Sequence, residues 1–368
     1  MKDAISRQAA IAWSRERELS PQRLWPAIRE RGGVEALLSC DEEELVRLLG
    51  SASRARAARR APEDPGPRRW AQEIERAGIG LLTPFDPEFP SLLVEIADPP
   101  LLLFVLGNRE RLRSPAVAVV GSRNATRYGR DVASALGKGL SSVGVSVVSG
   151  LARGVDTAAH EAALDGPGGT IAVLGCGLDV DYPRENARLK REIERSGVLL
   201  SEFAPGEEPR PQNFPIRNRI IAGLSSGVVV VEASRRSGSL ITARLAADFG
   251  RDVFAVPGSV FSETSAGAHE LLRDGAILCR GVDDVFAELF PALQSAPASW
   301  ASPAAAPPDL TAEARRLFEV LASESPASAE DLVRATDFPA AVVLAGLMEL
   351  EAAGLAAESD GRYELSRR

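Results

Sequence analysis

Short apolar runs recur between residues 117 and 256, and amphipathic stretches separate them. The runs are rich in Val and are followed by Gly, Ser or Arg. Such runs are typical of strands that are buried on both faces of a parallel sheet and joined by crossover helices. The pattern predicts a doubly wound, mostly parallel α/β sheet with strands at 117–120, 145–148, 171–174, 198–200, 228–231 and 253–256.

The ends of these strands carry small residues and arginines. Gly121-Ser122-Arg123 follows the first strand, and Ser149-Gly150, with Arg153 three residues on, follows the second. The carboxyl ends of parallel strands share one edge of an open sheet, so we expect a ligand crevice there. Asp156 is expected to cap the helix that starts after the second strand.

The segment 213–242 predicts a helix, a strand, a small-residue turn and a second helix in succession. A small-residue turn at a helix N-terminus presents backbone N–H groups to an anion. Arginines lie on the first helix and before the turn, so the expected anion is a phosphate or a run of phosphates. The polar residues of this segment that would form the site are Arg217, Asn218, Arg219, Ser237, Gly238, Ser239 and Thr242.

Helical patterns flank the α/β region on both sides. Residues 1–75 predict a helical domain with helix starts at Pro21 and after Asp41, and Gly32-Gly33 separates two of its helices. That glycine turn could contact a DNA backbone, but a packing or dimer-contact module is the favoured interpretation. The segment 62–67, PEDPGP, is interpreted as a boundary. The α/β domain is assigned to 76–291.

The C-terminal part predicts a linker and a winged helix. Residues 292–308 are rich in Ala, Pro and Ser, and 309–368 carry three helical patterns followed by a hairpin. The third helix, 339–353, contains no Lys, Arg, Asn or Gln, the residues that read base edges in a DNA groove. We therefore expect a protein-interaction or autoregulatory module rather than a reader of duplex DNA.

Composition limits the classes of function and the cellular locations that we expect. The net charge of −8 argues against an all-over nucleic-acid-binding surface, so such a site must be local. Three widely spaced cysteines fit a reducing compartment. The N-terminus has no apolar core of a signal peptide, and no run is long enough to span a membrane. A cytoplasmic protein without membrane association is expected.

Motifs for cofactor or metal chemistry are missing. Neither a dinucleotide fingerprint nor a phosphate-loop lysine occurs, so we expect no cofactor. His160 is interpreted as a helix residue hydrogen-bonded to a neighbouring loop, and His269 likewise. Glu202 and Glu232 are expected to orient arginines or to accept backbone N–H groups. Asp179 and Asp181, as a pair without a third ligand, are expected to be turn and cap residues rather than a metal site.

Several long motifs resemble the DprA/Smf family, the DNA-processing proteins of bacterial natural transformation. They are GSR (121–123), SGLARGVDTAAHEAAL (149–164), TIAVLGCGLDVDYPRENARL (170–189), SEFAPGEEPRPQNFPIRNRIIAGLS (201–225) and EASRRSGSLITARLAADFGRDVFAVPGS (232–259). The resemblance covers residues 80–290. It implies an extended Rossmann-like domain that binds single-stranded DNA, between a sterile-alpha-motif-like (SAM-like) N-terminal domain and a winged helix.

The resemblance also implies a function and partners. It suggests a non-enzymatic recombination mediator that protects incoming single-stranded DNA and loads the RecA recombinase onto it during natural transformation. It implies a homodimer through the Rossmann-like domain, near His269, Leu271, Leu272, Ile277 and Leu278.

The DNA interface is expected to be dominated by backbone contacts. Carried over from the family motifs are Arg123, the basic pair Arg217 and Arg219 with Asn218, and the serine–glycine–serine turn. Phe214 could stack on a base or belong to the core, and both interpretations stay open. The full predicted interface is Gly121, Ser122, Arg123, Ser149, Gly150, Arg153, Phe214, Arg217, Asn218, Arg219, Ser237, Gly238, Ser239 and Thr242.

The rival hypothesis is an enzyme. A Rossmann-like sheet with a Gly/Ser turn after an acidic strand end also resembles nucleotide phosphoribohydrolases. Those enzymes carry a P-G-G-x-G-T-type loop followed by a catalytic glutamate, whereas no glutamate follows the turn at 237–242 within the helix start. The missing acid favours the DNA-binding interpretation.

Overall fold

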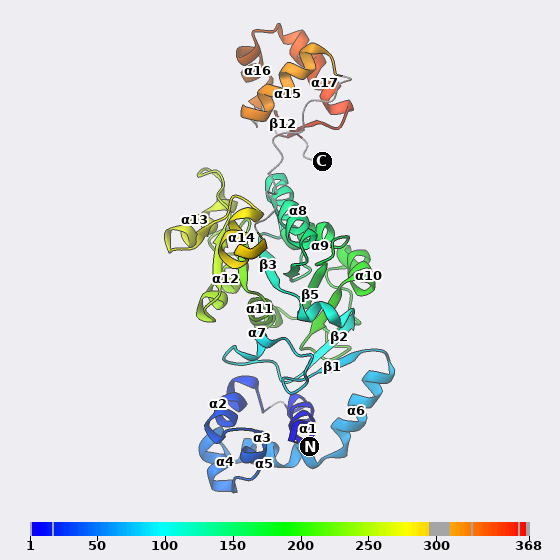
Figure 1. Cartoon of the computed structure of the whole chain (residues 1–368), viewed down its shortest axis with the longest axis vertical. Coiled ribbons are helices and arrows are strands. Elements are labelled where there is room, and N and C mark those ends of the chain that lie inside the picture. Colours follow the sequence, from blue (N-terminus) through cyan, green and yellow to red (C-terminus); the bar gives the residue numbers. More distant parts are fainter. Residues whose placement is uncertain (1, 17, 294–309, 325–326, 360, 366–368) are drawn as a thin grey trace. The chain divides into compact units, whose positions relative to one another are not determined.

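The computed structural model describes residues 2–16, 18–293, 310–324, 327–359 and 361–365 (Figure 1). It forms two compact units, Met1–Ala296 and Pro297–Arg368. From residue 294 on, the predicted linker lies outside the described residues.

A nine-stranded sheet is the centre of the first unit, in the order β1-β2-β6-β5-β4-β3-β7-β8-β9. All neighbours from β6 to β9 are parallel, and only β1–β2 and β2–β6 are antiparallel. The predicted doubly wound, mostly parallel sheet is therefore confirmed. Its strands are β1 (Gly80–Leu82), β2 (Leu103–Gly107), β3 (Ala116–Val120), β4 (Ser146–Ser149), β5 (Thr170–Leu174), β6 (Val198–Ser201), β7 (Gly227–Val230), β8 (Asp252–Ala255) and β9 (Ile277–Leu278).

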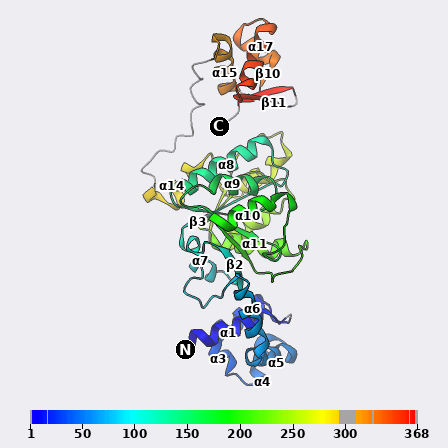
Figure 2. The same cartoon turned by 90° about the vertical axis from the view of Figure 1, so that its right-hand side faces the viewer.

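Helices cover both faces of this sheet. Alternate residues of β3 point to opposite faces, so Val117 and Val119 pack with one helical layer while Ala118 and Val120 pack with the other. In the first layer α8 and α9 lie side by side (Figure 1 and Figure 2). That layer contains α8 (Arg127–Ser142), α9 (Val155–Ala163), α10 (Ala187–Ser196) and α14 (Val282–Leu289); the other contains α7 (Ser91–Val94), α11 (Asn213–Leu224), α12 (Ser239–Asp248) and α13 (Ala266–Arg273).

The chain changes direction across the sheet at β3. From β3 it proceeds through β4 and β5 to β6, and α11 then carries it back to β7 on the other side of β3. The loops that follow β3 and β7 therefore diverge, which is the geometry that opens a ligand crevice at the carboxyl edge of such a sheet.

The N-terminal region is helical, as predicted. Asp41 caps α4 by accepting from Glu44 N–H, and Gly32, with φ of 77°, ends α2 in the left-handed conformation. The expected boundary at 62–67 instead forms the start of a helix, because Pro65 takes the first helical position after the Asp64 cap. The helices are α1 (Lys2–Ser14), α2 (Pro21–Arg31), α3 (Val34–Leu38), α4 (Glu42–Leu49), α5 (Ala52–Arg60) and α6 (Pro65–Arg76).

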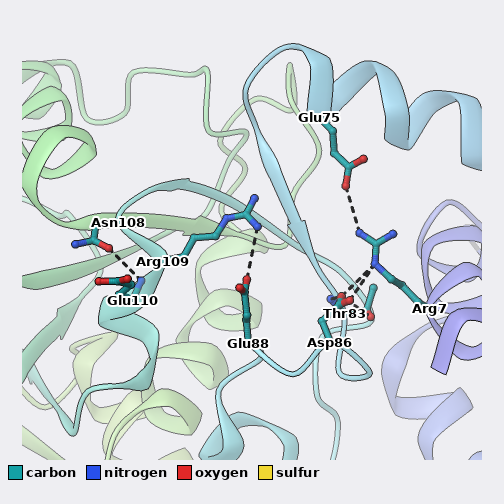
Figure 3. A network of polar contacts seen from close by, with 8 residues as sticks. All are labelled: Arg7, Glu75, Thr83, Asp86, Glu88, Asn108, Arg109 and Glu110. Carbon is teal, nitrogen blue, oxygen red and sulfur yellow. Dashed lines mark hydrogen bonds and ion pairs between the residues drawn. The ribbon is translucent and has the colours of Figure 1, made fainter.

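Polar contacts join these helices to the α/β part. Trp25 donates to Pro99 O (2.6 Å). Arg7 lies between Glu75 and Asp86 (Figure 3), and Asp86 also accepts from the N–H and hydroxyl of Thr83. The helical region thus packs against the sheet within one compact unit.

The second unit has the predicted winged-helix arrangement. Ser328 and Asp331 form a capping box at the start of its second helix. The third helix exposes Leu344 and Met348. The elements are α15 (Ala312–Glu324), α16 (Ala329–Thr336) and α17 (Ala340–Ala352), with β10 (Ala327–Ser328), β11 (Ala356–Ser359) and β12 (Arg362–Leu365) in the sheet order β10-β12-β11. Within the described parts of the chain, no helix has the length and apolar character to cross a membrane.

The Asp86 contacts give a prediction about stability. Asp86→Ala should lower the free energy of unfolding by about 1–3 kcal/mol, because it leaves the Thr83 N–H without its acceptor. Urea unfolding measures the change. Glu75→Ala is the matched control: it removes the more exposed partner of Arg7 and should cost less than about 1 kcal/mol. Equal losses in the two variants would contradict this account of the junction.

Candidate nucleic-acid interface

The loop after β3 lies at the carboxyl edge of the sheet, where the topology predicts the crevice. A Cβ on Gly121 would lie 2.6 Å from Val155 Cγ2 and 3.0 Å from Glu232 O, so only glycine fits there. Arg123 is exposed. Among the described residues, none accepts a hydrogen bond from the N–H of Ser122 or Arg123. These two N–H groups and the Arg123 guanidinium are available to an anion.

Buried side chains hold the loop after β4 from below. Asp156 accepts from the N–H groups of Gly150 (3.1 Å) and Ala152 (3.2 Å). It therefore lies inside α9 as a loop anchor, and the expectation that it caps the helix is wrong: Gly154 holds the cap position. Burial raises the pKa of the Asp156 carboxyl. The Gly150 N–H, expected from the sequence to face DNA, is already occupied.

His160 holds the same loop. Its Nε2 accepts from Leu151 N–H (3.3 Å), and Nδ1 lies 2.6 Å from the Thr170 hydroxyl, which itself donates to Val147 O. Nδ1 is therefore the protonated nitrogen. Burial, with Arg217 nearby, lowers the pKa of His160 to about 3. The interpretation of His160 as a residue bonded to a neighbouring loop is confirmed.

Arg217 lies beneath the crevice. Its side chain is buried, and Nη1 donates to Gly150 O (2.8 Å) and to Val173 O. Burial lowers its pKa to about 10, although Asp156 acts in the opposite direction. A direct phosphate contact, as expected from the sequence, would require Arg217 to leave these carbonyl groups.

Arg219 points to a different neighbourhood. It is buried, and Nη2 donates to both carboxylate oxygens of Glu202 (2.6 and 2.7 Å), while Nε lies 3.3 Å from Asp98. Burial raises the pKa of Glu202, and Asp98 adds to the shift. Glu202 thus orients an arginine, as expected, and Arg219 is held toward Glu202 and Asp98, while its buried Nη1 has no hydrogen-bond partner among the described residues.

An aromatic pair stands beside Arg123. The rings of Phe214 and Tyr182 are 5.5 Å apart with their planes tilted by 39°, and the Arg123 guanidinium lies 5.3 Å from the Phe214 ring. Phe214 is half-buried and Tyr182 is 36% exposed. The sequence left Phe214 open between core and stacking, and missed Tyr182 as a partner. The signal for Tyr182 was its place in the loop that follows β5.

The turn before α12 follows β7 and so lies at the same carboxyl edge of the sheet. The Ser237 and Ser239 hydroxyls lie 2.7 Å apart, and Asn218 donates to Gly238 O (3.3 Å). Gly238 is exposed, and its N–H makes no hydrogen bond to a described residue. Thr242 is buried one turn into the helix. Arg236 is one of the two arginines that the sequence showed before this turn, although the predicted interface did not include it. It is exposed and forms no ion pair within the described part of the chain.

The remaining polar side chains near the strand ends already have partners within the protein. Glu232 is buried and accepts from the N–H and hydroxyl of Thr126 (2.9 and 2.6 Å), as expected of a backbone acceptor. Ser149 donates to Val119 O, and exposed Arg153 lies 3.6 Å from Glu185. Asp179 accepts from Gly206 N–H. Within the described residues, no cluster of three or more His, Cys, Asp or Glu side chains could hold a metal ion.

The residues expected at a dimer contact lie on α13 and on β9, the edge strand next to β8. His269 Nε2 is 3.1 Å from Gly258 O. Leu271 and Ile277 line a groove between α12, α13 and the edge strand β9, and Leu278 is 46% exposed. Leu272 is half-buried.

Fold and site together define a Rossmann-like α/β protein with an appended winged helix and a polar, arginine-bearing carboxyl edge. Residues 80–290 match the family described as DNA recombination-mediator protein A, and residues 301–362 match the DprA winged helix domain. The chain therefore belongs to the DprA/Smf family of DNA-processing proteins, as its motifs indicated.

Similar proteins and structures agree with this assignment. The putative DNA processing protein DprA of Mycobacterium tuberculosis is 39% identical over 349 residues, covering 88% of this chain and 90% of that protein. The X-ray structure of DNA processing protein A from Streptococcus pneumoniae matches with a TM-score of 0.66 and 40% identity, over 76% of this chain and 96% of that one. The Helicobacter pylori protein, whose structure is described for its single-stranded DNA binding mode, matches with a TM-score of 0.53 and 32% identity, over 58% and 96%.

The environment of His160 predicts a pH dependence of stability. Its folded pKa lies below its ordinary value of 6.5, so the unfolded chain binds the proton first and stability falls as the pH drops below 6.5, down to about 3. His160 should contribute a slope of up to about 1.4 kcal/mol per pH unit in this window. Urea unfolding between these pH values should show a shallower slope for His160→Gln. Equal slopes in both proteins would contradict a neutral, buried His160.

Proposed function

We propose that this protein binds single-stranded DNA in the crevice formed by the loops after β3, β4, β5 and β7, and acts there as a recombination mediator. The observation that carries the proposal is the exposed Arg123 beside the Phe214–Tyr182 pair. A single strand needs phosphate donors along its backbone and flat surfaces for its unpaired bases, and both meet at this point.

The site residues divide into two groups. Arg123, with the free N–H groups of Ser122 and Gly238, supplies donors for phosphates, and Arg153 can add to them after leaving Glu185. Phe214 supplies a stacking surface. Arg217, Arg219 and Asn218 support these groups from below: they fix the loops through carbonyl and carboxylate contacts.

Binding is proposed to be sequence-tolerant and without catalysis. Phosphates and base faces are common to every sequence, so contacts to them do not select one sequence over another. Glu232, the acid at the end of β7, already accepts two hydrogen bonds from Thr126 and is buried, which disfavours a role as the base of a phosphoribohydrolase. Nucleoside-monophosphate hydrolysis by the purified protein would favour the rival enzyme.

The mediator role is proposed from the family. Its description as a recombination mediator supports a role in DNA recombination. For that role we propose loading of RecA onto single-stranded DNA and protection of that DNA during natural transformation, in the cytoplasm. A RecA filament assay on strands covered by single-strand-binding protein tests this step separately from DNA binding. Binding without any gain in filament formation would restrict the function to DNA binding.

Two crevice substitutions should separate the phosphate contact from stacking. Arg123→Ala should flatten the log–log salt dependence of binding by about 0.7, the slope for one phosphate contact on a single strand. Phe214→Ala should cost about 1–3 kcal/mol with little change in slope, because stacking is not ionic. Fluorescence anisotropy with a labelled homothymidine strand measures both effects.

The matched control is Arg188→Ala, which removes an arginine that is 87% exposed and paired with Glu192 on α10. It should bind like the parent protein. If Arg123→Ala and Phe214→Ala also bound like the parent, the crevice would not be the DNA site.

The winged-helix unit should not supply DNA affinity. Residues 309–368 contain about twice as many acids as bases, and the exposed face of α17 carries Leu344 and Met348 but no cation. A chain that ends at residue 296 should bind single-stranded DNA as tightly as the full chain, or slightly more tightly. Loss of binding on truncation would identify the winged helix as part of the DNA interface.

A homodimer is proposed through the β9 edge and α13. Exposed Leu278 on an edge strand, beside half-buried Leu271, Leu272 and Ile277, offers an apolar contact next to His269. Light scattering at micromolar concentration should give the mass of a dimer, and Leu278→Asp should give a monomer. A monomeric parent protein would overturn this proposal without affecting the DNA site.

A further inference from the structure

The helices α5 and α6 carry a basic stretch that the crevice does not use. From Arg54 to Arg69 the sequence has six arginines against two acids, Glu63 and Asp64, whereas the whole chain carries a net charge of −8. The positive charge is therefore concentrated on α5 and α6, which belong to the helical region that packs against the sheet.

These arginines point outward. On α5, Arg56, Arg59 and Arg60 are exposed, while the alanines at 55, 57 and 58 face the core of the helical region. Arg68 and Arg69 are exposed in the first two turns of α6. The two helices follow one another along the chain and are joined by a single turn, Ala61–Glu63 (Figure 1).

Few partners neutralise this charge. Arg59 donates to Cys40 O, and Arg56 approaches Glu42 only to 3.7 Å across an exposed surface. Within the described residues, the side chains of Arg60, Arg68 and Arg69 form neither a hydrogen bond nor an ion pair. Three of the five exposed cations are therefore free for an external anion.

Helix stability explains only part of the arrangement, since the dipole of α5 favours Arg59 and Arg60 in its last turn. Arg56 and Arg60 are like charges at i and i+4, which destabilises a helix slightly. Arg68 and Arg69 lie near the positive end of the α6 dipole, where acids are favoured. A bound polyanion would relieve both repulsions.

We propose that the α5–α6 surface, defined by Arg56, Arg60, Arg68 and Arg69, binds the phosphate backbone of nucleic acid outside the crevice. The inference rests on the proposed function for the identity of the polyanion. Arginine matches phosphate through its planar fork of donors.

The chemistry of this surface is restricted to phosphates. Trp70, the nearest aromatic residue, is half-buried, packs edge-on against Phe104 and is covered by Arg15 at 4.4 Å. No ring is left to stack on bases, so single-stranded and duplex DNA should bind alike here. A lipid surface fits less well, because an interfacial helix needs an exposed apolar face, and no large apolar side chain is exposed between residues 52 and 76.

The test uses the full chain with Arg56, Arg60, Arg68 and Arg69 all changed to Gln. The salt slope of binding should flatten by up to about 3 on a long homothymidine strand, since each single-strand phosphate contact contributes about 0.7. The slope on duplex DNA should flatten as well. The fourfold Arg→Lys variant should keep most of the slope, which separates lost charge from lost folding.

The matched control changes four other exposed arginines to Gln, each paired with an acid three or four residues away along the chain: Arg188, Arg280, Arg316 and Arg334. It alters net charge equally and should leave the slope unchanged. Three results would each overturn the inference. The first is an equal flattening of the slope in the control, and the second is an unchanged slope in the α5–α6 variant. The third is an α5–α6 variant that loses binding to anionic vesicles but binds DNA like the parent protein.

The crevice variant keeps the two proposals apart. If Arg123→Ala weakens binding while the α5–α6 variant does not, the crevice stands and the second surface fails. If only the α5–α6 variant weakens binding, the crevice fails and the second surface stands. If each variant weakens DNA binding and the two fold-losses in affinity multiply in the combined variant, both proposals are supported.

Discussion

The burial of Arg217 is the constraint on which the crevice depends. A buried guanidinium is costly unless hydrogen bonds and opposite charge compensate it. Here Gly150 O and Val173 O accept from it, and Asp156 lies close enough to act on its charge. Asp156 also accepts from the Gly150 N–H, so both backbone polar groups of this residue are fixed by a buried pair of opposite charge. These contacts therefore fix the conformation of the loop after β4.

Helix α11 extends this constraint in two directions. Phe214 faces the crevice from its first turn, and Asn218 holds the turn before α12 through Gly238 O. On its other side Arg219 pairs with Glu202 and Asp98, and Asp98 accepts from Gln22 of the N-terminal region. One helix thus connects the crevice, the sheet and the helical region, which explains why three consecutive polar residues are buried in it.

Much of the fold was predictable, because β-branched runs and small residues at strand ends are local signals. The antiparallel attachment of β2 to β6 was not, since pairing partners far apart in sequence are not encoded in either strand alone. The same holds for the site. The helix, strand and turn pattern of the sequence placed Arg217 and Arg219 near the sheet edge. Their burial was not predictable, because it depends on acceptors from β5, from the residue after β6 and from a distant loop. Tyr182 was missed because its role arises only from its contact with Phe214.

The most direct test of the account is photo-crosslinking with a single strand that carries 5-iododeoxyuridine, followed by mass spectrometry of the linked peptides. Stacked bases should crosslink to the peptide containing Phe214 or to the one containing Tyr182, and Phe214→Ala should abolish the first. Crosslinks confined to the winged helix or to the β9 edge, with none in these two peptides, would contradict single-stranded DNA binding in the crevice.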